Sequence, residues 1–148
     1  MKKLLSVVLV FCSVFGVLSI NCEALSAKAA VVISGDTGEI IYSYNCNQRL
    51  SMASTTKIMT GLLLCERGNL DREIVITPQM VAVEGSSMGL RAGDIVTLRD
   101  LLYGLMLPSG NDAANSIAIT LGGSIENFAF MMNEKAKKMG LTNTHFAT

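Results

Sequence analysis

An uncharged apolar segment near the N-terminus limits how much of this chain can enter a folded domain. The segment spans residues 4–20 and follows a short basic start that ends at Lys3. A basic start followed by an apolar stretch of this length is typical of a secretory signal peptide. We therefore expect residues 1–24 to be a cleaved leader, with an uncleaved membrane anchor as the alternative. Residues 25–148 are then enough for one domain and too few for two.

The composition of the chain excludes some classes of partner. The 12 basic and 12 acidic side chains give a formal net charge of zero. A neutral chain has no general electrostatic attraction to a phosphate backbone, so nucleic acid is not expected as a partner. Half of the residues are hydrophobic and 16% are charged, which is too apolar a composition for a disordered chain.

Cysteine and methionine usage indicates neither a metal site nor a disulfide framework. Two of the four cysteines fall in the expected leader, which leaves Cys46 and Cys65. Their spacing matches no zinc motif, and two thiols are not a framework. They could pair in an oxidising compartment or remain as small, half-buried apolar residues. The nine methionines, Met59 and Met106 among them, are expected mostly to pack on apolar helix faces.

Hydrophobic patterning predicts strands in the first half of the chain. Apolar runs at 29–34 and 39–44 flank turn residues at 35–38, which is the pattern of a β-hairpin. A further short strand is expected at 73–77, where Pro78 ends it.

The middle and the end of the chain are predicted to be largely helical. Apolar residues recur there at helical spacing, and each run ends at glycine or proline. The expected helices are 53–66, 98–107, 112–121 and 124–139. Thr97 with Asp100 three residues later resembles a capping box at the start of the second of these helices.

The first predicted helix begins with a serine and a lysine three positions apart, Ser54 and Lys57. Such positions share one face of a helix, so the lysine amine can reach the serine hydroxyl. A serine hydroxyl becomes a good nucleophile only when a neighbouring base takes its proton. The spacing alone is common, however, and it equally fits an N-cap serine beside a solvent-facing lysine.

A second polar pair, Ser109 and Asn111, falls in the loop between the second and third predicted helices. A tight turn after Pro108 would present the hydroxyl and the carboxamide outward. A hydroxyl there could relay a proton, and a carboxamide could hold a peptide carbonyl. The alternative is an ordinary turn between helices, and Ser43-Tyr44-Asn45 shows that the bare pattern also occurs where no role is assigned.

With their flanking residues, the two pairs resemble the motifs of a known enzyme family. The chain reads Met-Ala-Ser-Thr-Thr-Lys-Ile-Met-Thr from Met52 and Met-Leu-Pro-Ser-Gly-Asn-Asp-Ala-Ala from Met106. Ser-x-x-Lys followed by Ser-x-Asn is the order in serine acyl-transferases that react with penicillins. Together with 84–88, these segments strongly resemble the D-alanyl-D-alanine carboxypeptidases, the low-molecular-mass penicillin-binding proteins. The resemblance covers nearly all of residues 27–148.

The resemblance implies a fold, a site and a reaction. The fold would be α+β, of the β-lactamase and penicillin-binding-protein transpeptidase type, with a helical subdomain and an antiparallel sheet. Ser54 would be the acylated nucleophile and Lys57 its general base. Ser109 would shuttle a proton, and Asn111 would orient the substrate peptide. The reaction implied is removal of the terminal D-Ala from the peptidoglycan stem pentapeptide, with no metal or organic cofactor.

Partners and location follow from the same resemblance. β-Lactam antibiotics would act as covalent inhibitors. An exported protein of the bacterial cell envelope fits a substrate outside the cytoplasmic membrane. Membrane contact is expected only through an uncleaved leader or through a C-terminal anchor of the kind that many family members carry.

The resemblance is incomplete in one motif. No lysine in residues 1–148 is followed by Thr-Gly, the third motif of the family. We therefore expect a truncated copy, with an incomplete sheet and impaired activity. One alternative is a class A β-lactamase-like hydrolase, for which Ser-Asp-Asn is expected where this chain has Ser-Gly-Asn. Another is a non-catalytic remnant that binds the cell wall.

Overall fold

The computed structural model describes residues 26–147, which divide into two compact units. The first unit contributes the described residues up to Leu50, and the second begins at Ser51. The expected leader, residues 1–24, lies outside the described residues. Within residues 26–147, none of the helices combines the length and the apolar composition needed to cross a membrane.

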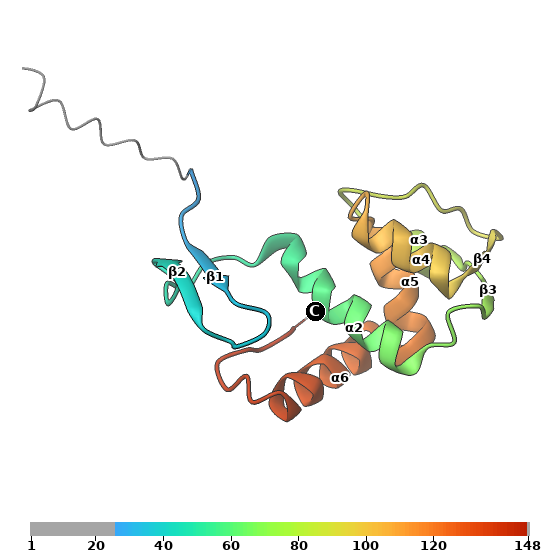
Figure 1. The fold of residues 1–148 in the computed structure, drawn as a ribbon. Helices are drawn as coiled ribbons and strands as arrows, with labels where there is room; N and C mark the ends of the chain where they lie inside the picture. Colours follow the sequence, from blue (N-terminus) through green and yellow to red (C-terminus); the bar gives the residue numbers. More distant parts are fainter. Residues whose placement is uncertain (1–25, 148) are drawn as a thin grey trace, which may run out of the picture. The chain divides into compact units, whose positions relative to one another are not determined.

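The first unit is the expected β-hairpin (Figure 1). β1 (Ala30–Ile33) pairs antiparallel with β2 (Ile40–Tyr44), and Val32 lies opposite Tyr42. The register shifts between Val32 and Ile33, which is the signature of a bulge or a similar irregularity. The predicted hairpin is therefore confirmed, with strands slightly shorter than the apolar runs.

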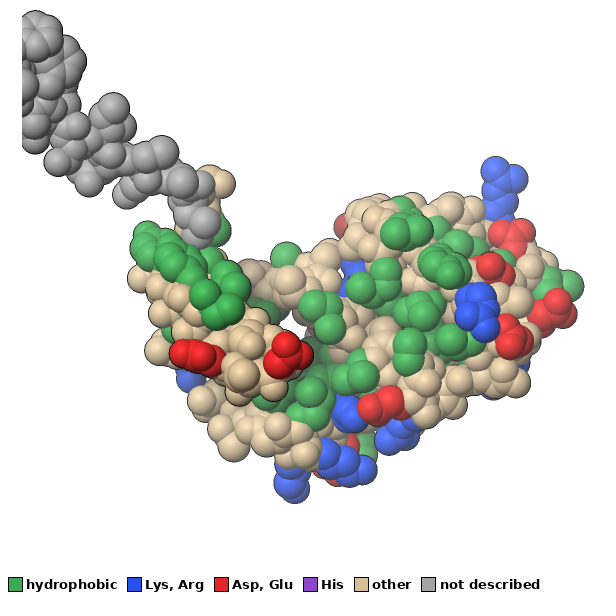
Figure 2. Space-filling model, in the orientation of Figure 1, with side chains coloured by type: hydrophobic (Ala, Val, Ile, Leu, Met, Phe, Trp, Pro, Cys, Tyr) green, Lys and Arg blue, Asp and Glu red, His purple; other side chains and the backbone are tan. Residues whose placement is uncertain are grey.

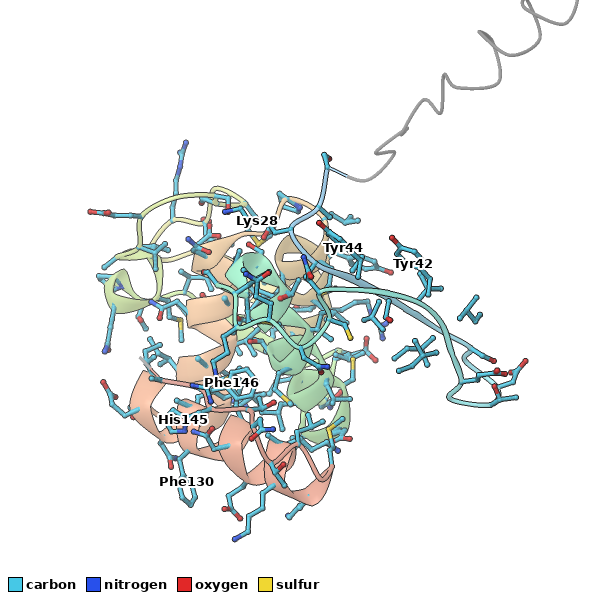
Figure 3. All side chains as sticks on the ribbon, turned by 90° about the vertical axis from the view of Figure 1, so that its left-hand side faces the viewer. Lys28, Tyr42, Tyr44, Phe130, His145 and Phe146 are labelled. Carbon is cyan, nitrogen blue, oxygen red and sulfur yellow. The ribbon has the colours of Figure 1, made fainter. Side chains whose placement is uncertain are left out.

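The turn of the hairpin depends on glycine. Gly38 has a φ of 72°, a left-handed conformation that glycine adopts without a steric penalty. Its N–H donates to the carbonyl oxygen of Ser34 at 2.9 Å and closes the turn. All five side chains of β2 are exposed, and those of Tyr42 and Tyr44 project from the strand (Figure 3). Two strands with little burial of their own form a hairpin of marginal stability.

The second unit is built around helix α5 (Asn111–Gly122). This helix contacts α2 (Lys57–Arg67), α3 (Pro78–Val81), α4 (Leu98–Met106) and α6 (Ile125–Lys138). The four long helices correspond to those predicted from apolar spacing, and that prediction is confirmed. Their apolar faces form one shared core. The most deeply buried side chains of that core are Leu63, Leu64, Leu98, Leu101, Leu105 and Ile117.

The start of the first predicted helix differs from expectation. Its first turn is a 3-10 helix, η1 (Ala53–Thr56), and the chain becomes α-helical from Lys57. No side chain caps either start, and the tighter 3-10 bonds supply partners for the first N–H groups instead. Gly68 ends α2 as predicted, in an extended conformation with a φ of −89°. A Cβ at Gly68 would lie 2.7 Å from the Leu64 carbonyl oxygen, so glycine is needed for space there.

The second unit also contains a two-stranded sheet, of which the sequence predicted the strand at 73–77 and missed the partner strand. β3 (Glu73–Val75) pairs antiparallel with β4 (Ile95–Thr97), and Ile74 lies opposite Val96. β4 has only three residues, which is too short for an alternating pattern to stand out. Helix α3 was missed as well, because Pro78 was interpreted only as the end of a strand. Proline is also favourable at the first position of a helix, and that is its place in α3.

Several sulfur-containing side chains are more exposed than expected. Met59 is buried, but Met106 is 52% exposed, so the packing prediction is wrong for Met106. Cys46 and Cys65 are both free and exposed, and the expectation of half-buried thiols is also wrong. Figure 2 shows hydrophobic side chains over the visible face of the second unit. Exposed apolar residues of this unit include Ile58, Tyr103, Met106 and Leu107.

The segment after α6 returns along that helix (Figure 3). Asn133 exchanges two hydrogen bonds with the backbone of Phe146, each of 2.8 Å. His145 lines a shallow hollow with Lys137 and neighbouring residues. None of the four predicted site residues lines this hollow.

The predicted capping box at the start of α4 is present. The Thr97 hydroxyl oxygen accepts a hydrogen bond from the Asp100 N–H at 3.1 Å. The Asp100 carboxylate accepts in return from the Thr97 N–H at 2.9 Å and from its hydroxyl at 2.6 Å. Hydrogen bonds from the Thr97 side chain and then its backbone lower the pKa of Asp100 below the ordinary aspartate value. The box therefore holds α4 at its junction with β4.

Replacing Thr97 by alanine should lower the free energy of unfolding by about 1 kcal/mol, because it removes the N-cap acceptor. Thr97→Ser is the matched control, since it keeps the hydroxyl and should unfold close to the parent protein. Chemical denaturation monitored by circular dichroism measures both. Equal midpoints for the alanine and serine variants would contradict the assigned cap.

Candidate active site

All four side chains predicted for the site meet in the second unit. The Lys57 amine donates to the Ser54 Oγ at 3.4 Å and to the Asn111 Oδ1 at 2.7 Å. The Ser109 hydroxyl donates to the Ser54 Oγ at 2.9 Å. Two sequence segments that lie more than fifty residues apart therefore form one connected network of side chains.

Ser54 lies in the 3-10 turn and its side chain is exposed. The turn is held by Thr55, whose N–H and hydroxyl donate to the Met52 carbonyl oxygen at 3.1 Å and 2.5 Å. Ala53, directly before the serine, has a φ of 45°, in the left-handed region that non-glycine residues rarely adopt. The backbone leading to Ser54 is thus bent sharply, and its hydroxyl remains open to solvent.

Lys57 is the first residue of α2 and lies one turn after Ser54. Its side chain is half-buried, and both of its hydrogen-bond partners are neutral oxygens, on Ser54 and Asn111. The amine therefore lies within hydrogen-bond distance of the Ser54 hydroxyl, and the Asn111 carboxamide oxygen holds it there.

The loop that carries Ser109 is not an ordinary turn between helices. Ser109 has a φ of 58°, which costs a non-glycine residue about 1–2 kcal/mol. The Ser86 hydroxyl donates to the Ser109 carbonyl oxygen at 2.7 Å, and the Gly110 N–H donates to the Gly104 carbonyl oxygen at 2.9 Å. These bonds hold the backbone in the conformation that directs the Ser109 hydroxyl to Ser54.

Asn111 is the first residue of α5, and its carboxamide is partly used inside the protein. The Oδ1 atom accepts from Lys57, and the Nδ2 atom donates to the Glu84 carbonyl oxygen at 2.6 Å. The expectation that the whole carboxamide faces outward is therefore met only in part. One N–H and one oxygen lone pair remain for another partner.

Sequence reasoning missed Asp112, which is 1% exposed. Its Oδ2 accepts from the Ser87 hydroxyl at 2.6 Å and from the N–H groups of Gly89 and Leu90 at 3.0 Å each. Its Oδ1 accepts from the N–H groups of Met88 and Ala113 at 2.9 Å each. An acidic residue is common in the first turn of a helix, because the positive end of the helix dipole stabilises its charge. The position of Asp112 in the sequence therefore did not reveal that its carboxylate also binds a distant loop. The available signal was the neighbouring glycine- and serine-rich segment, whose free N–H groups need an acceptor.

The pKa of Asp112 reflects two opposed effects. Burial raises it, but hydrogen bonds from the Ser87 hydroxyl and from the N–H groups of Met88, Leu90 and Ala113 outweigh burial. The pKa therefore lies below the ordinary aspartate value, and the carboxylate is charged at neutral pH.

The network is suited to proton transfer around one exposed hydroxyl. The Ser54 Oγ lies beside an amine and a second hydroxyl, which is the arrangement of a serine nucleophile with an adjacent base. The contacts of the Ser54 Oγ are therefore compatible with nucleophilic attack by this hydroxyl. Separately, the described residues contain no group of three or more His, Cys, Asp and Glu side chains able to hold a metal ion.

Replacing Ser109 by glycine should relieve the left-handed strain and stabilise the protein by about 1 kcal/mol relative to Ser109→Ala. Both variants lose the hydroxyl, so their difference isolates the backbone conformation. Thermal denaturation of the two proteins side by side measures it. An alanine variant as stable as the glycine variant would argue against the strained turn.

Asp112→Asn should lower the free energy of unfolding at pH 7 by about 2–3 kcal/mol, because a neutral amide cannot accept all five hydrogen bonds. The folded-state pKa of Asp112 is lowered, so its contribution is complete above the unfolded value of about 3.9 and is lost as the pH falls through the folded value. The difference between wild type and variant should narrow below about pH 4 in denaturation curves. A difference that stays constant from pH 7 to pH 3 would be inconsistent with a buried, charged Asp112.

Comparison with known proteins identifies the family. The family described as D-alanyl-D-alanine carboxypeptidase (peptidase S11) matches residues 17–148. The chain is 40% identical over 128 residues to the D-alanyl-D-alanine carboxypeptidase DacF of Bacillus subtilis, a match over 83% of this chain and 33% of that protein. The structure of the carboxypeptidase DacD from Francisella tularensis matches with a TM-score of 0.77 at 39% identity, over 84% of this chain and 31% of that one. A variant of the Streptomyces K15 DD-transpeptidase matches with a TM-score of 0.78 at 38% identity, over 84% and 52%.

The chain spans about a third to a half of the length of these proteins. The similarity confirms the expected α+β fold of the penicillin-binding-protein type, with helices and small antiparallel sheets. It supports the carboxypeptidase interpretation and gives no support to the β-lactamase-like, wall-binding or impaired alternatives. With a family match over most of its length, the chain belongs to the D-alanyl-D-alanine carboxypeptidase family.

Proposed function

We propose that Ser54 is the nucleophile of a serine carboxypeptidase that removes the terminal D-Ala from peptidoglycan stem pentapeptides. The observation that carries the proposal is the pair of contacts at the Ser54 Oγ, with the Lys57 amine at 3.4 Å and the Ser109 hydroxyl at 2.9 Å. Family membership supplies the class of reaction. The contacts support the choice of Ser54, because an amine and a second hydroxyl lie within hydrogen-bond distance of its Oγ and could act as base and proton relay.

Acylation begins when the Lys57 amine, acting as the base, takes the proton of the Ser54 hydroxyl. The Oγ atom forms a bond to the carbonyl carbon of the penultimate D-Ala, and the amide bond to the terminal D-Ala breaks. The leaving nitrogen needs a proton. The Ser109 hydroxyl, which is hydrogen-bonded to Ser54, gives its proton to the leaving nitrogen. Lys57 then returns to Ser109 the proton that it took from Ser54, so the protons balance.

Deacylation is the reverse sequence with water in place of the leaving amine. Lys57 takes a proton from water, the hydroxide attacks the ester carbon, and the Ser54 oxygen recovers its proton as the shortened peptide leaves. One solved relative is called a DD-transpeptidase, a name that denotes transfer to an amine acceptor in that protein. Our proposal for this chain is hydrolysis, and an added amine acceptor distinguishes the two outcomes.

Asn111 is proposed to orient the substrate. Its remaining N–H can donate to a peptide carbonyl of the stem peptide while its Oδ1 keeps the Lys57 amine in place. One side chain would thus align the base and the scissile peptide together, which favours attack in a single geometry.

Location and inhibition follow from the same proposal. Residues 1–24 would be a leader for export, so that the site reaches its substrate in the bacterial cell envelope. A β-lactam carbonyl would be attacked by Ser54 as the peptide carbonyl is, with ring opening in place of D-Ala release. The product is a covalent adduct on the serine.

A labelled penicillin should therefore attach to Ser54 in the full-length protein that carries this sequence. Ser54→Ala should abolish labelling, and Lys57→Ala should slow it by about 100-fold or more because the base is lost. Ser51→Ala is a matched control, since Ser51 is exposed and contributes to none of the site's hydrogen bonds described above. Mass spectrometry of the labelled peptide identifies the modified residue, and release of D-Ala from a pentapeptide measures turnover.

Labelling that persists in the Ser54→Ala protein would refute Ser54 as the nucleophile. If the acyl group is transferred to an added amine, and no D-Ala is released by hydrolysis when the amine is left out, the activity is that of a transpeptidase and not of a carboxypeptidase.

A further inference from the structure

Asn111 and Asp112 are consecutive residues whose side chains contact different parts of the protein. Asn111 contacts Lys57 in the site, whereas the carboxylate of Asp112 is buried against the segment 87–90. A buried charge is costly unless hydrogen bonds compensate it. Four of the five donors to Asp112 come from that segment, so the segment cannot move away without leaving the carboxylate unsatisfied.

The same segment continues into direct contacts with the site. The Asn111 N–H donates to the Ser86 carbonyl oxygen at 2.7 Å, and the Ser86 hydroxyl donates to the Ser109 carbonyl oxygen at 2.7 Å. The Asn111 Nδ2 donates to the Glu84 carbonyl oxygen at 2.6 Å. A Cβ at Gly85 would lie 3.0 Å from that Nδ2 atom, so glycine allows this close approach. Residues 84–90, which we call the brace loop, thus touch both polar residues of the Ser-Gly-Asn turn.

The contact with Glu84 decides which end of the Asn111 carboxamide faces the lysine. Because the Glu84 carbonyl can only accept, it selects the Nδ2 end and leaves Oδ1 toward the Lys57 amine. With the carboxamide reversed, two donors would face each other at Lys57 and two acceptors at Glu84. The position of the brace loop therefore controls the hydrogen bond that holds the proposed base.

We propose that Asp112 is a positioning residue for the acylation of Ser54. Its carboxylate anchors the brace loop, and the loop fixes the Asn111 carboxamide so that its oxygen holds Lys57 beside Ser54. Asp112 itself touches neither Ser54 nor Lys57 in its hydrogen-bond network. The inference deepens the proposed function and rests on it.

The test compares the rate at which a labelled penicillin acylates full-length wild type and Asp112→Asn. In the variant, an NH2 group replaces one carboxylate oxygen and cannot accept from the brace loop. We expect the acylation rate constant to fall on the order of 10- to 100-fold, as for a displaced catalytic group, with little change in the dissociation constant of the non-covalent complex. A rate equal to wild type overturns the proposal.

A double-mutant cycle separates positioning from a general loss of structure. If Asp112 acts through Asn111, then adding Asp112→Asn to an Asn111→Ala protein should slow acylation no further. A merely structural effect would slow acylation by the same factor in both backgrounds, and that additive result overturns the proposal.

Variants at Ser87 keep the test decisive if Asp112→Asn does not fold. Ser87→Ala removes one donor to Asp112 and should slow acylation by up to about ten-fold. Ser87→Thr keeps the hydroxyl and should restore the rate, whereas equal rates for the alanine variant and wild type overturn the proposal. If wild type itself is not acylated at Ser54, the proposed function fails and this inference fails with it. If wild type is acylated at Ser54 and the variants are acylated at the same rate, only the positioning role of Asp112 is rejected, and the proposed function stands.

Discussion

The buried carboxylate of Asp112 is the interaction on which the arrangement of the site depends. A charge at 1% exposure is stable only because five donors surround it, and four of them come from one loop. Its partners are backbone N–H groups and a hydroxyl. The same segment also packs Met88 and Leu90 against the hydrophobic core, so hydrogen bonds to a buried charge and apolar packing hold it together.

Two helix starts meet at the site, and this explains how distant residues are placed with precision. Lys57 begins α2 and Asn111 begins α5, and both helices belong to the same buried core. Side chains on rigid elements hold a geometry better than side chains on free loops. Ala53 and Ser109, by contrast, lie outside the α-helices and have left-handed backbone conformations close to the hydroxyls of the site. Strain of this kind persists only where the surrounding structure compensates for it, and it is typical of functional sites.

Prediction from the sequence succeeded where the signal was local. Apolar spacing predicted the four long helices, glycine predicted the hairpin turn, and Thr97 with Asp100 predicted the capping box. It failed for β4, α3 and the 3-10 turn, because these elements are only three or four residues long, and β4 also depends on pairing with a strand elsewhere in the chain. Met106 was misplaced for a related reason, since a helical period cannot tell which face finds a neighbour.

By itself, the sequence determined the residue types of the site, their order and the family to which they belong. It could not determine that the Ser109 hydroxyl lies 2.9 Å from Ser54, or that the Asn111 oxygen faces Lys57. It also left Asp112 looking like an ordinary helix-start carboxylate. Only the tertiary structure decided these points, because each is a contact between segments far apart in the chain. Such contacts depend on how the helices pack and on which buried polar groups form hydrogen bonds with one another. The spacing of residues within one segment determines neither.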